Sequence, residues 1–302
     1  MKLFKTLVAV ATTAVMSANA APMEFTVTHA PGGPSDTVTR IIAKHLDDKS
    51  LVVVNRPGAG GRIAMRHVIN GNAMSLATMS QIFVTNPMLA DSNLEYDPVK
   101  DLQLIGVVAS MPSVLVCNKS KNVKTVTDLD KTQNLTFGFA GYGSSEHLAT
   151  EVLLKKVKST HRLVPYSKGG SAAVQDMMAG NIDCMFANYP TVRGFVSSDR
   201  LEFVMSSHNV GLKVPTWKTL FKEEFPFQSY LGLVVGSSMD PIERQALVKS
   251  LTVTFKKPEF LNDLKEAGVF PVAGTDPTTI SMGLYNNVVL RNLIVNNNIK
   301  LK

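Results

Sequence analysis

Short apolar runs, glycine-rich turns and helical stretches alternate along the first third of the chain. Residues 25–28 alternate apolar and polar positions as a strand does, proline and glycine interrupt that pattern at 30–34, and apolar positions at helical spacing follow through residue 46. A second β-branched run at 51–54 leads into a second such turn at 55–61 and another helical stretch. Two strand–turn–helix units in tandem predict an α/β fold with a largely parallel sheet, whose ligands bind at the carboxyl ends of the strands.

The pattern recurs in the middle of the chain, after an apolar segment at 104–117. Residues 135–138 and 163–164 each lead into a glycine-rich turn and a helical stretch, and 182–186 form a further strand. A strand-like run at 230–235 follows, and the tail is helical. These units predict a second α/β lobe and a double crossover between the lobes, although the pattern does not show which lobe the tail joins.

The first 20 residues have the features of a secretory signal peptide. Lys2 and Lys5 precede an apolar run at 7–16, and Ala18 and Ala20 are small residues where signal peptidase requires them. The run is too short to span a bilayer, which weakens the alternative of a helix kept in the mature protein. We expect cleavage after Ala20 and a mature protein outside the cytoplasm.

Composition excludes several classes of protein. Hydrophobic residues make up 45% and charged residues 18% of the 302 residues, which excludes a disordered chain, a collagen and a coiled coil. The formal net charge of +7 includes the two signal lysines and is spread in short patches, which favours an anionic ligand but not a nucleic acid. Cys117 and Cys184 could pair in an oxidising compartment, but both lie in apolar strand-like runs, so two buried free thiols are the favoured interpretation.

Glycine-rich turns that open helices are the main chemical signal in this sequence. Four such turns occur, at 30–34, 55–61, 140–145 and 165–170. Glycine lets the backbone approach an anion closely, and a helix start offers unpaired N–H groups and a partial positive charge. Such turns can hold a carboxylate without any charged side chain. The alternative is that proline and glycine only end the strands, as they do in many α/β proteins.

The sequence lacks the common motifs of catalysis and metal binding. Gly141 and Gly143 are not followed by the third glycine of a dinucleotide fingerprint, and neither a phosphate-binding loop nor a G-x-S-x-G elbow occurs. The histidines and cysteines show no metal-ligand spacing. A hydrolase built on Ser144 or Ser171 with a histidine is therefore a weak alternative. We expect neither an enzyme, nor a cofactor, nor a metal site.

The order of the turns and of the short motifs between them gives the chain a specific resemblance. The series comprises Ala30-Pro-Gly-Gly-Pro-Ser-Asp36, Asn55-Arg-Pro-Gly-Ala-Gly-Gly61, Asn86-Pro87, Tyr96-Asp-Pro-Val-Lys-Asp-Leu102, Gly141-Tyr-Gly-Ser-Ser-Glu-His147, Val164-Pro-Tyr166 with Gly169-Gly170, Gly180-Asn-Ile-Asp183 and Val214-Pro-Thr216. In this order and at this spacing, the series resembles the Bug family, the periplasmic solute receptors of tripartite tricarboxylate transporters. The resemblance covers nearly the whole mature chain.

The resemblance implies a two-lobed periplasmic binding protein of the Venus flytrap type. Such a protein closes over a small organic carboxylate and delivers it to the membrane subunits of the transporter, and we expect it to be a monomer. With hinges near 105 and 225, lobe 1 comprises 21–105 and 225–302, and lobe 2 comprises 106–224. Asp36 would orient the first turn rather than touch the anion. The expected ligand-binding residues, from the family pattern and the positions beside it, are His29, Ala30, Gly33, Ser35, Asp36, Thr78, Ser80, Gly143, Ser144, His147, Tyr166, Lys168 and Asn188.

Three positions depart from the family pattern. His29 stands where the family has an aromatic residue, Asn72-Ala-Met-Ser75 replaces an aspartate-glycine-tyrosine stretch, and Ala187 followed by Asn188 replaces an acidic or polar position. His29 either is protonated beside a bound carboxylate or stays neutral and fills the space of the usual ring. A periplasmic sensor read by a signalling membrane protein is the alternative function, and a secreted hydrolase is the third.

Overall fold

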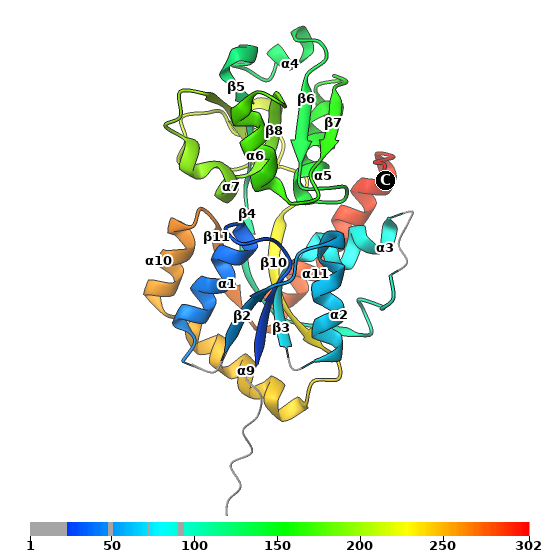
Figure 1. The fold of residues 1–302 in the computed structure, drawn as a ribbon, viewed down its shortest axis with the longest axis vertical. Helices are drawn as coiled ribbons and strands as arrows, with labels where there is room; N and C mark the ends of the chain where they lie inside the picture. The colour runs from blue at the N-terminus through cyan, green and yellow to red at the C-terminus, as the bar shows by residue number, and fades with distance from the viewer. Residues whose placement is uncertain (1–22, 48–50, 72, 90–93, 302) are drawn as a thin grey trace, which may run out of the picture.

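Two lobes make up the molecule in the computed structural model, which describes residues 23–47, 51–71, 73–89 and 94–301 (Figure 1). The predicted signal peptide, residues 1–20, lies outside the described residues. Each lobe is a β-sheet flanked by helices, as the sequence predicted. No helix within these described ranges is both long enough and apolar enough to cross a bilayer.

The first lobe contains a six-stranded mixed sheet. Its strands are β1 Glu24–Val27, β2 Val52–Asn55, β3 Ala73–Thr78, β4 Leu102–Met111, β10 Ser229–Gly236 and β11 Phe270–Gly274. They lie in the order β11-β4-β10-β3-β1-β2. The strands β1, β2 and β3 pair in parallel, whereas β10 is antiparallel to both neighbours and β11 is antiparallel to β4. The parallel expectation therefore holds only for the strands of the strand–turn–helix units.

Helices cover both faces of the first sheet. They are α1 Pro34–His45, α2 Arg62–Asn70, α9 Pro241–Thr254, α10 Pro258–Glu266 and α11 Pro277–Asn296. On one face, Ile42 of α1, Phe255 and Phe260 pack in one cluster with Met74 and Leu76 of β3. On the other face, α2 packs against the neighbouring residues of β3. Successive residues of a strand point to opposite faces of the sheet, and helices cover both faces here. The fully buried strands therefore do not alternate apolar and polar residues in the sequence.

The second lobe contains a five-stranded mixed sheet in the order β7-β6-β8-β5-β9. Its strands are β5 Ser113–Asn118, β6 Thr136–Phe139, β7 Arg162–Pro165, β8 Cys184–Asn188 and β9 Leu201–Ser206. Its helices are α4 Asp128–Lys131, α5 Ser145–Lys156, α6 Gly170–Ala179, α7 Tyr189–Val192 and α8 Trp217–Phe221. Here β6 is parallel to β7 and β8, and β5 is antiparallel to β8 and β9.

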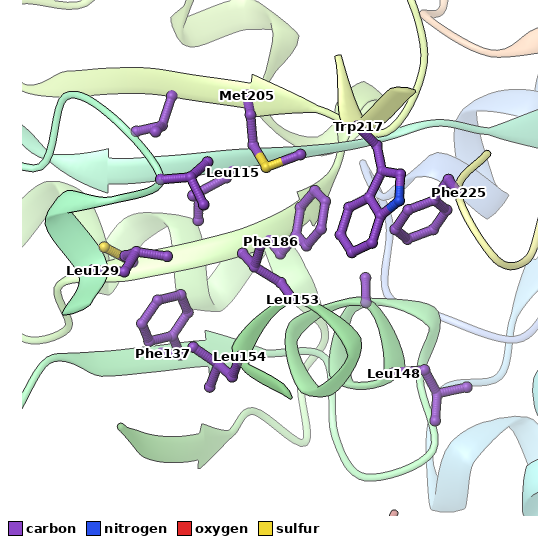
Figure 2. Packing of buried hydrophobic residues seen from close by; sticks show 14 of the residues in the cluster. Leu115, Leu129, Phe137, Leu148, Leu153, Leu154, Phe186, Met205, Trp217 and Phe225 are labelled. Atoms are coloured by element: carbon purple, nitrogen blue, oxygen red, sulfur yellow. The ribbon is translucent and has the colours of Figure 1, made fainter. Parts of the chain in front are cut away.

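Apolar side chains from α5 and the sheet form the main core of the second lobe. Leu148 and Leu153 of α5 belong to one cluster with Phe137 and Phe186 of the sheet, and Trp217 closes one end of it (Figure 2). On the opposite face, α6 packs against the alternate residues of β5 and β8. This packing fixes the start of α5 at the end of β6, where the candidate site lies.

The chain leaves the first sheet at Met111 and enters the second at Ser113, with Pro112 between them. The predicted boundary at 105 therefore falls inside β4, which is one continuous strand of the first sheet up to Met111. The chain returns between the end of β9 at Ser206 and the start of β10 at Ser229, a stretch that includes the predicted boundary at 225. Only Pro112 separates β4 from β5, so residues 104–117 read as one apolar segment in the sequence although they belong to two sheets.

Two segments of the first lobe also pack into the core of the second. Helix α11 begins beside β4 and β11 and ends with Leu290 and Ile294 in the cluster around α5 (Figure 1). A single π-helical turn, η2 Gln81–Thr85, places Val84 in the same cluster. The expected lobe 1 range 225–302 thus contains residues that belong to the core of lobe 2. The hydrophobic periodicity of the tail could not show this, because it predicts a helix without indicating which lobe that helix packs against.

A disulfide joins Cys117 of β5 to Cys184 of β8. The favoured interpretation of two free thiols was wrong. The two residues lie 67 positions apart in sequence but directly opposite each other in the antiparallel ladder. Both residues are buried in the core of the second lobe, as the sequence indicated, and the strand register places their side chains next to each other.

Candidate functional site

The turn between β1 and α1 supplies one wall of the candidate site. Gly32 adopts a positive φ of 82°, and Gly33 follows in an extended conformation as the residue before the helix. Pro34 then occupies the first helical position, where its missing N–H costs no hydrogen bond. The start of α1 therefore points its unpaired backbone N–H groups to the end of the strand.

Asp36 holds this turn from behind. Its carboxylate accepts hydrogen bonds from Gly32 N–H (2.9 Å), Arg40 Nε (3.1 Å) and Asn55 Nδ2 (2.9 Å). Burial raises the pKa of Asp36, but these donors outweigh it and hold the pKa below its usual range. Asn55 also donates to the carbonyl oxygen of His29 (3.0 Å), so it joins the second glycine-rich turn to the first. Asp36 is thus an ionised internal anchor, which is the orienting position that the sequence suggested.

His29 lies at the edge of the same turn, on the wall of the cavity described below. Its Nδ1 is 2.8 Å from Thr28 Oγ1 and 3.5 Å from Ser35 Oγ. Burial lowers the pKa of His29 below 6.5, so the imidazole is neutral at neutral pH. Any protonation of His29 at neutral pH would therefore have to be induced by an anion beside it.

The turn between β6 and α5 faces the first turn from the other lobe. Gly141 and Gly143 have φ values of 91° and 77°. Ser144 is the N-cap of α5, and its Oγ accepts a hydrogen bond from His147 N–H (3.1 Å). A side chain added at Gly143 would lie 2.7 Å from Thr85 Oγ1, which itself donates to the carbonyl oxygen of Gly143 (2.9 Å). Glycine is required here both by the backbone conformation and by this contact with the first lobe.

His147 supports the second turn from inside the protein. Its side chain is fully buried, and Gly143 N–H donates to its Nδ1 (3.2 Å). The imidazole packs against the rings of Phe139 and Tyr142, at 4.7 and 5.2 Å between centroids. Burial lowers the pKa of His147 to about 4, so the ring is neutral. Its Nε2 has no hydrogen-bond partner among the described residues.

Glu146, which the sequence analysis did not select, is a buried acid in the same turn. It is 1% exposed, and its carboxyl group accepts hydrogen bonds from Ala140 N–H at Oε2 (3.0 Å) and Asn188 N–H at Oε1 (3.3 Å). A Cβ atom at Gly170 would lie 2.6 Å from Oε1, so the carboxyl group rests against the start of α6. Burial raises the pKa of Glu146 to about 7, and the two backbone hydrogen bonds only partly oppose this.

A cavity lies between the two turns. The predicted residues that line it are His29, Ala30, Gly33, Ser35, Thr78, Ser144, Lys168 and Asn188. The residues on its wall that sequence reasoning did not select include Gln81, Ser145, Glu146, Gly170, Ser171 and Thr191. The cleft continues past Lys168 into a more open part, bordered by the Gly58–Arg62 turn. The structure therefore brings both predicted turns to one enclosed space.

Five predicted residues lie outside the wall of this cavity. Asp36 and His147 support the two turns from behind, and Gly143 contacts Thr85. The remaining two lie elsewhere in the fold. Tyr166 donates from its hydroxyl group to Asp176 Oδ2 (2.7 Å), and Ser80 is buried at the start of η2. The turn motifs identified the right loops, but the loops place only some of their side chains toward the cavity.

Three helix N-termini converge on the cavity. Gly33 and Ser35 stand at the start of α1, Ser144 and Ser145 at the start of α5, and Gly170 at the start of α6. Each N-terminus carries unpaired N–H groups and about half a positive charge, which stabilise an anion. Within the part of the chain that the structure describes, no three histidine, cysteine or acidic side chains are grouped to hold a metal ion.

Comparisons with known proteins give one family model, curated relatives and solved structures of the same fold. The family model described as tripartite tricarboxylate transporter family receptor, TctC, matches residues 37–288. Protein BugT of Bordetella pertussis is 26% identical over 278 residues, which cover 86% of this chain and 84% of BugT. The structure of the periplasmic binding protein BugD superposes with a TM-score of 0.82 at 21% identity, covering 92% of this chain and 98% of BugD. Rpa4515 of R. palustris with adipate gives a TM-score of 0.84 at 20% identity, covering 92% and 97%.

Proposed function

The chain belongs to the tripartite tricarboxylate transporter receptor family, and we propose that it is a periplasmic receptor for a small organic carboxylate. In this proposal, the carboxylate binds in the cavity between the lobes and draws them together. The closed monomer then delivers its ligand to the membrane subunits of a tripartite tricarboxylate transporter. The cavity binds and releases the ligand without turnover.

The observation that carries the proposal is the convergence of three helix N-termini on one enclosed cavity. Ser35, Ser144 and Ser145 add hydroxyl groups at these positions, and Asn188 adds an amide. Among the described residues, Lys168 is the lysine on the wall of the inner cavity, and its positive charge favours an anion there. Rpa4515, a protein of this fold, was solved with adipate, which is a small organic carboxylate.

The proposed location rests on three independent features. The predicted signal peptide ends at Ala20, and we propose cleavage at that position. The disulfide between Cys117 and Cys184 is of a kind that persists in oxidising compartments such as the periplasm. The structural neighbour BugD is itself a periplasmic binding protein.

Thermal unfolding of the stripped protein with a panel of acids tests the proposal. The panel contains adipate, malate, citrate and benzoate, each also titrated by calorimetry. A ligand at 100 times its Kd stabilises the native state by about 2.7 kcal/mol, which raises the melting temperature measurably. A panel that leaves the melting temperature unmoved would count against a carboxylate receptor.

A valine at Gly33 provides the matched variant. Gly33 has an ordinary extended backbone, and the nearest atom to an added Cβ is Ala30 O at 3.6 Å, so the fold should accept Gly33→Val. The added side chain stands on the cavity wall, and we expect it to abolish binding of the acid. Gly194→Val, at an exposed glycine with nothing within 4 Å of the added Cβ, is the control and should bind as the wild type does.

A further inference from the structure

Glu146 is an acid at a site whose other features all favour an anion. Glu146 lines the cavity at the start of α5, and both of its carboxyl oxygens lie within 2.8 Å of where a Cβ at Gly170, at the start of α6, would stand. An ionised carboxyl group here would face a bound carboxylate across a buried cavity, where charges of the same sign repel strongly. The same carboxyl group in its neutral form is a hydrogen-bond donor to an anion.

Within the described part of the chain, Glu146 is not paired with a cation. The chain around it contributes Ala140, Asn188 and Thr191, which are uncharged, and its helical neighbour His147 is neutral. The charged or titratable groups that share its cavity are Lys168 from the turn before α6 and His29 from the first lobe. Among the described residues, Glu146 takes part in no ion pair. Its carboxyl group accepts hydrogen bonds from two backbone N–H groups.

We propose that Glu146 binds the ligand as a carboxylic acid, donating its proton to a carboxylate oxygen of the ligand, so that the receptor takes up a proton with each acid it binds. This inference rests on the proposed function. The proton comes from solvent, adds to Glu146 and leaves again when the ligand dissociates, and no other bond forms or breaks. Oε1 is suited to carry it, because its bond from Asn188 N–H (3.3 Å) is the longer of the two.

Linkage fixes the direction of the pH effect. In the ligand-free protein, burial raises the pKa of Glu146 to about 7, and a ligand anion raises it further. Affinity is therefore greatest below about pH 7 and falls, by up to about tenfold per pH unit, as pH rises through the pKa of the complex. His29 titrates below 6.5 in the free protein, so its contribution lies at lower pH.

Asp36 is a buried acid that holds its turn without lining the cavity, and it serves as the comparison for Glu146. Asp36 lies behind its turn, outside the cavity wall, and its charge is matched by Arg40. Glu146 lies on the wall and has no such partner. A positioning role alone would make Glu146 important for stability but would leave proton uptake on binding unchanged when it is replaced by glutamine.

Calorimetry at pH 8 in two buffers of different ionisation enthalpy counts the protons directly. The probe is adipate, or the panel acid with the largest shift in melting temperature. We expect wild type to take up about 0.5 to 1 proton, and Glu146→Gln, which keeps a donor, to bind with uptake near zero and with affinity that stays flat from about pH 7 to 9. Glu202→Gln, on β9 of the same lobe and outside the cavity wall, should behave as wild type.

Infrared difference spectra of wild type provide a second readout that needs no stable variant. Adding the probe at pH 8 should produce the carbonyl band of a protonated carboxyl group. Binding without proton uptake, or uptake that persists in Glu146→Gln, would overturn the role of Glu146 and leave the receptor function standing. If no acid of the panel binds at any pH, both proposals fail together.

Discussion

The turn before α1 and the turn before α5 face each other across the cavity. Each contains a buried acid, and the two acids differ in their hydrogen-bond and ion-pair partners. Asp36 accepts hydrogen bonds from Gly32 N–H and Asn55 and pairs with Arg40, which keeps it ionised. Glu146 accepts two backbone hydrogen bonds and has no cation, and burial moves its pKa to about 7. The same local motif thus yields a fixed charge in one lobe and a titrating group in the other.

The two turns also differ in how firmly they need glycine. Gly33 has an ordinary extended conformation and room for a Cβ at normal contact distance, whereas Gly143 has a positive φ and touches Thr85 of the first lobe. The first turn, in which Gly32 also has a positive φ, is held by hydrogen bonds to the side chains of Asp36 and Asn55. The second is held by the backbone conformation of Gly143, by the side chain of His147 and by the contact with Thr85.

Replacing glycine by alanine in each turn tests this difference most strongly. Gly143→Ala should destabilise the protein by about 3 kcal/mol, because it combines a left-handed backbone with a Cβ 2.7 Å from Thr85 Oγ1. Gly33→Ala should cost less than about 1 kcal/mol. Urea unfolding measures both, and equal losses would contradict the proposed difference between the turns.

The pH dependence of stability should separate the two acids. Native Glu146 keeps its proton up to about pH 7, while the unfolded chain releases it near pH 4.5. Its contribution to stability therefore falls as pH rises from about 4.5 to 7, by about 3 kcal/mol. Subtracting the stability of Glu146→Gln from that of wild type at each pH should reveal this fall. Asp36→Asn should show no such difference above about pH 5, where Asp36 is ionised in both states.

His147 masks this fall in the wild-type protein. Its native pKa of about 4 lies below the ordinary 6.5, so its contribution is present above about pH 6.5 and is lost as pH falls through 4. The slopes of Glu146 and His147 oppose each other between about pH 4.5 and 6.5. His147→Gln is the control, because it should expose the slope that Glu146→Gln removes. A wild-type profile that equals the Glu146→Gln profile at every pH would refute the titration of Glu146.

The affinity for a bound acid should respond to His29 at lower pH than to Glu146. A ligand anion raises the pKa of His29 from its depressed value, so affinity rises as pH falls through the pKa of the complex and levels off below that of the free protein. His29→Phe should remove this rise, an effect of less than about tenfold. Calorimetric titrations from about pH 5 to 8 measure it. Identical slopes in wild type and His29→Phe would leave His29 as packing.

Loss of Arg40 should have the smallest effect. Its side chain is 53% exposed, so water screens its pairing with Asp36. Asp36 would still accept from Gly32 N–H and Asn55. We expect Arg40→Gln to lower the free energy of unfolding by about 0.5 kcal/mol and to leave ligand affinity unchanged. A loss as large as that of Gly143→Ala would show that the ion pair, and not the network, holds the first turn.

Much of the fold could be predicted because it is local. Proline, serine and acidic residues after a glycine mark the start of α1, and Ser144 marks the start of α5 as its N-cap. The central antiparallel strand β10 and the crossing of α11 into the second lobe could not be predicted. Both depend on partners far away in the sequence, which periodicity does not identify.

The candidate site was predictable only at the level of its loops. Glu146 was overlooked because an acid in the first turn of a helix commonly serves only the helix dipole. Its function depends on burial against Gly170, which comes from another strand–turn–helix unit. Gln81 lies one residue beyond Ser80, and the π-helical turn that begins there sets which of these side chains reaches the wall. The pairing of Cys117 with Cys184 likewise depends on strand register.

The position of β10 controls when the first lobe can fold during synthesis. This strand lies between β3 and β4, yet the ribosome makes it about 120 residues after β4 and after the whole second sheet. Pairings between distant segments form slowly, because the entropy of closing a long loop must be overcome first. A nascent chain therefore cannot complete its central sheet until its last quarter has emerged. This order of synthesis suits the proposed export, because the first lobe cannot complete its fold before nearly the whole chain has been made.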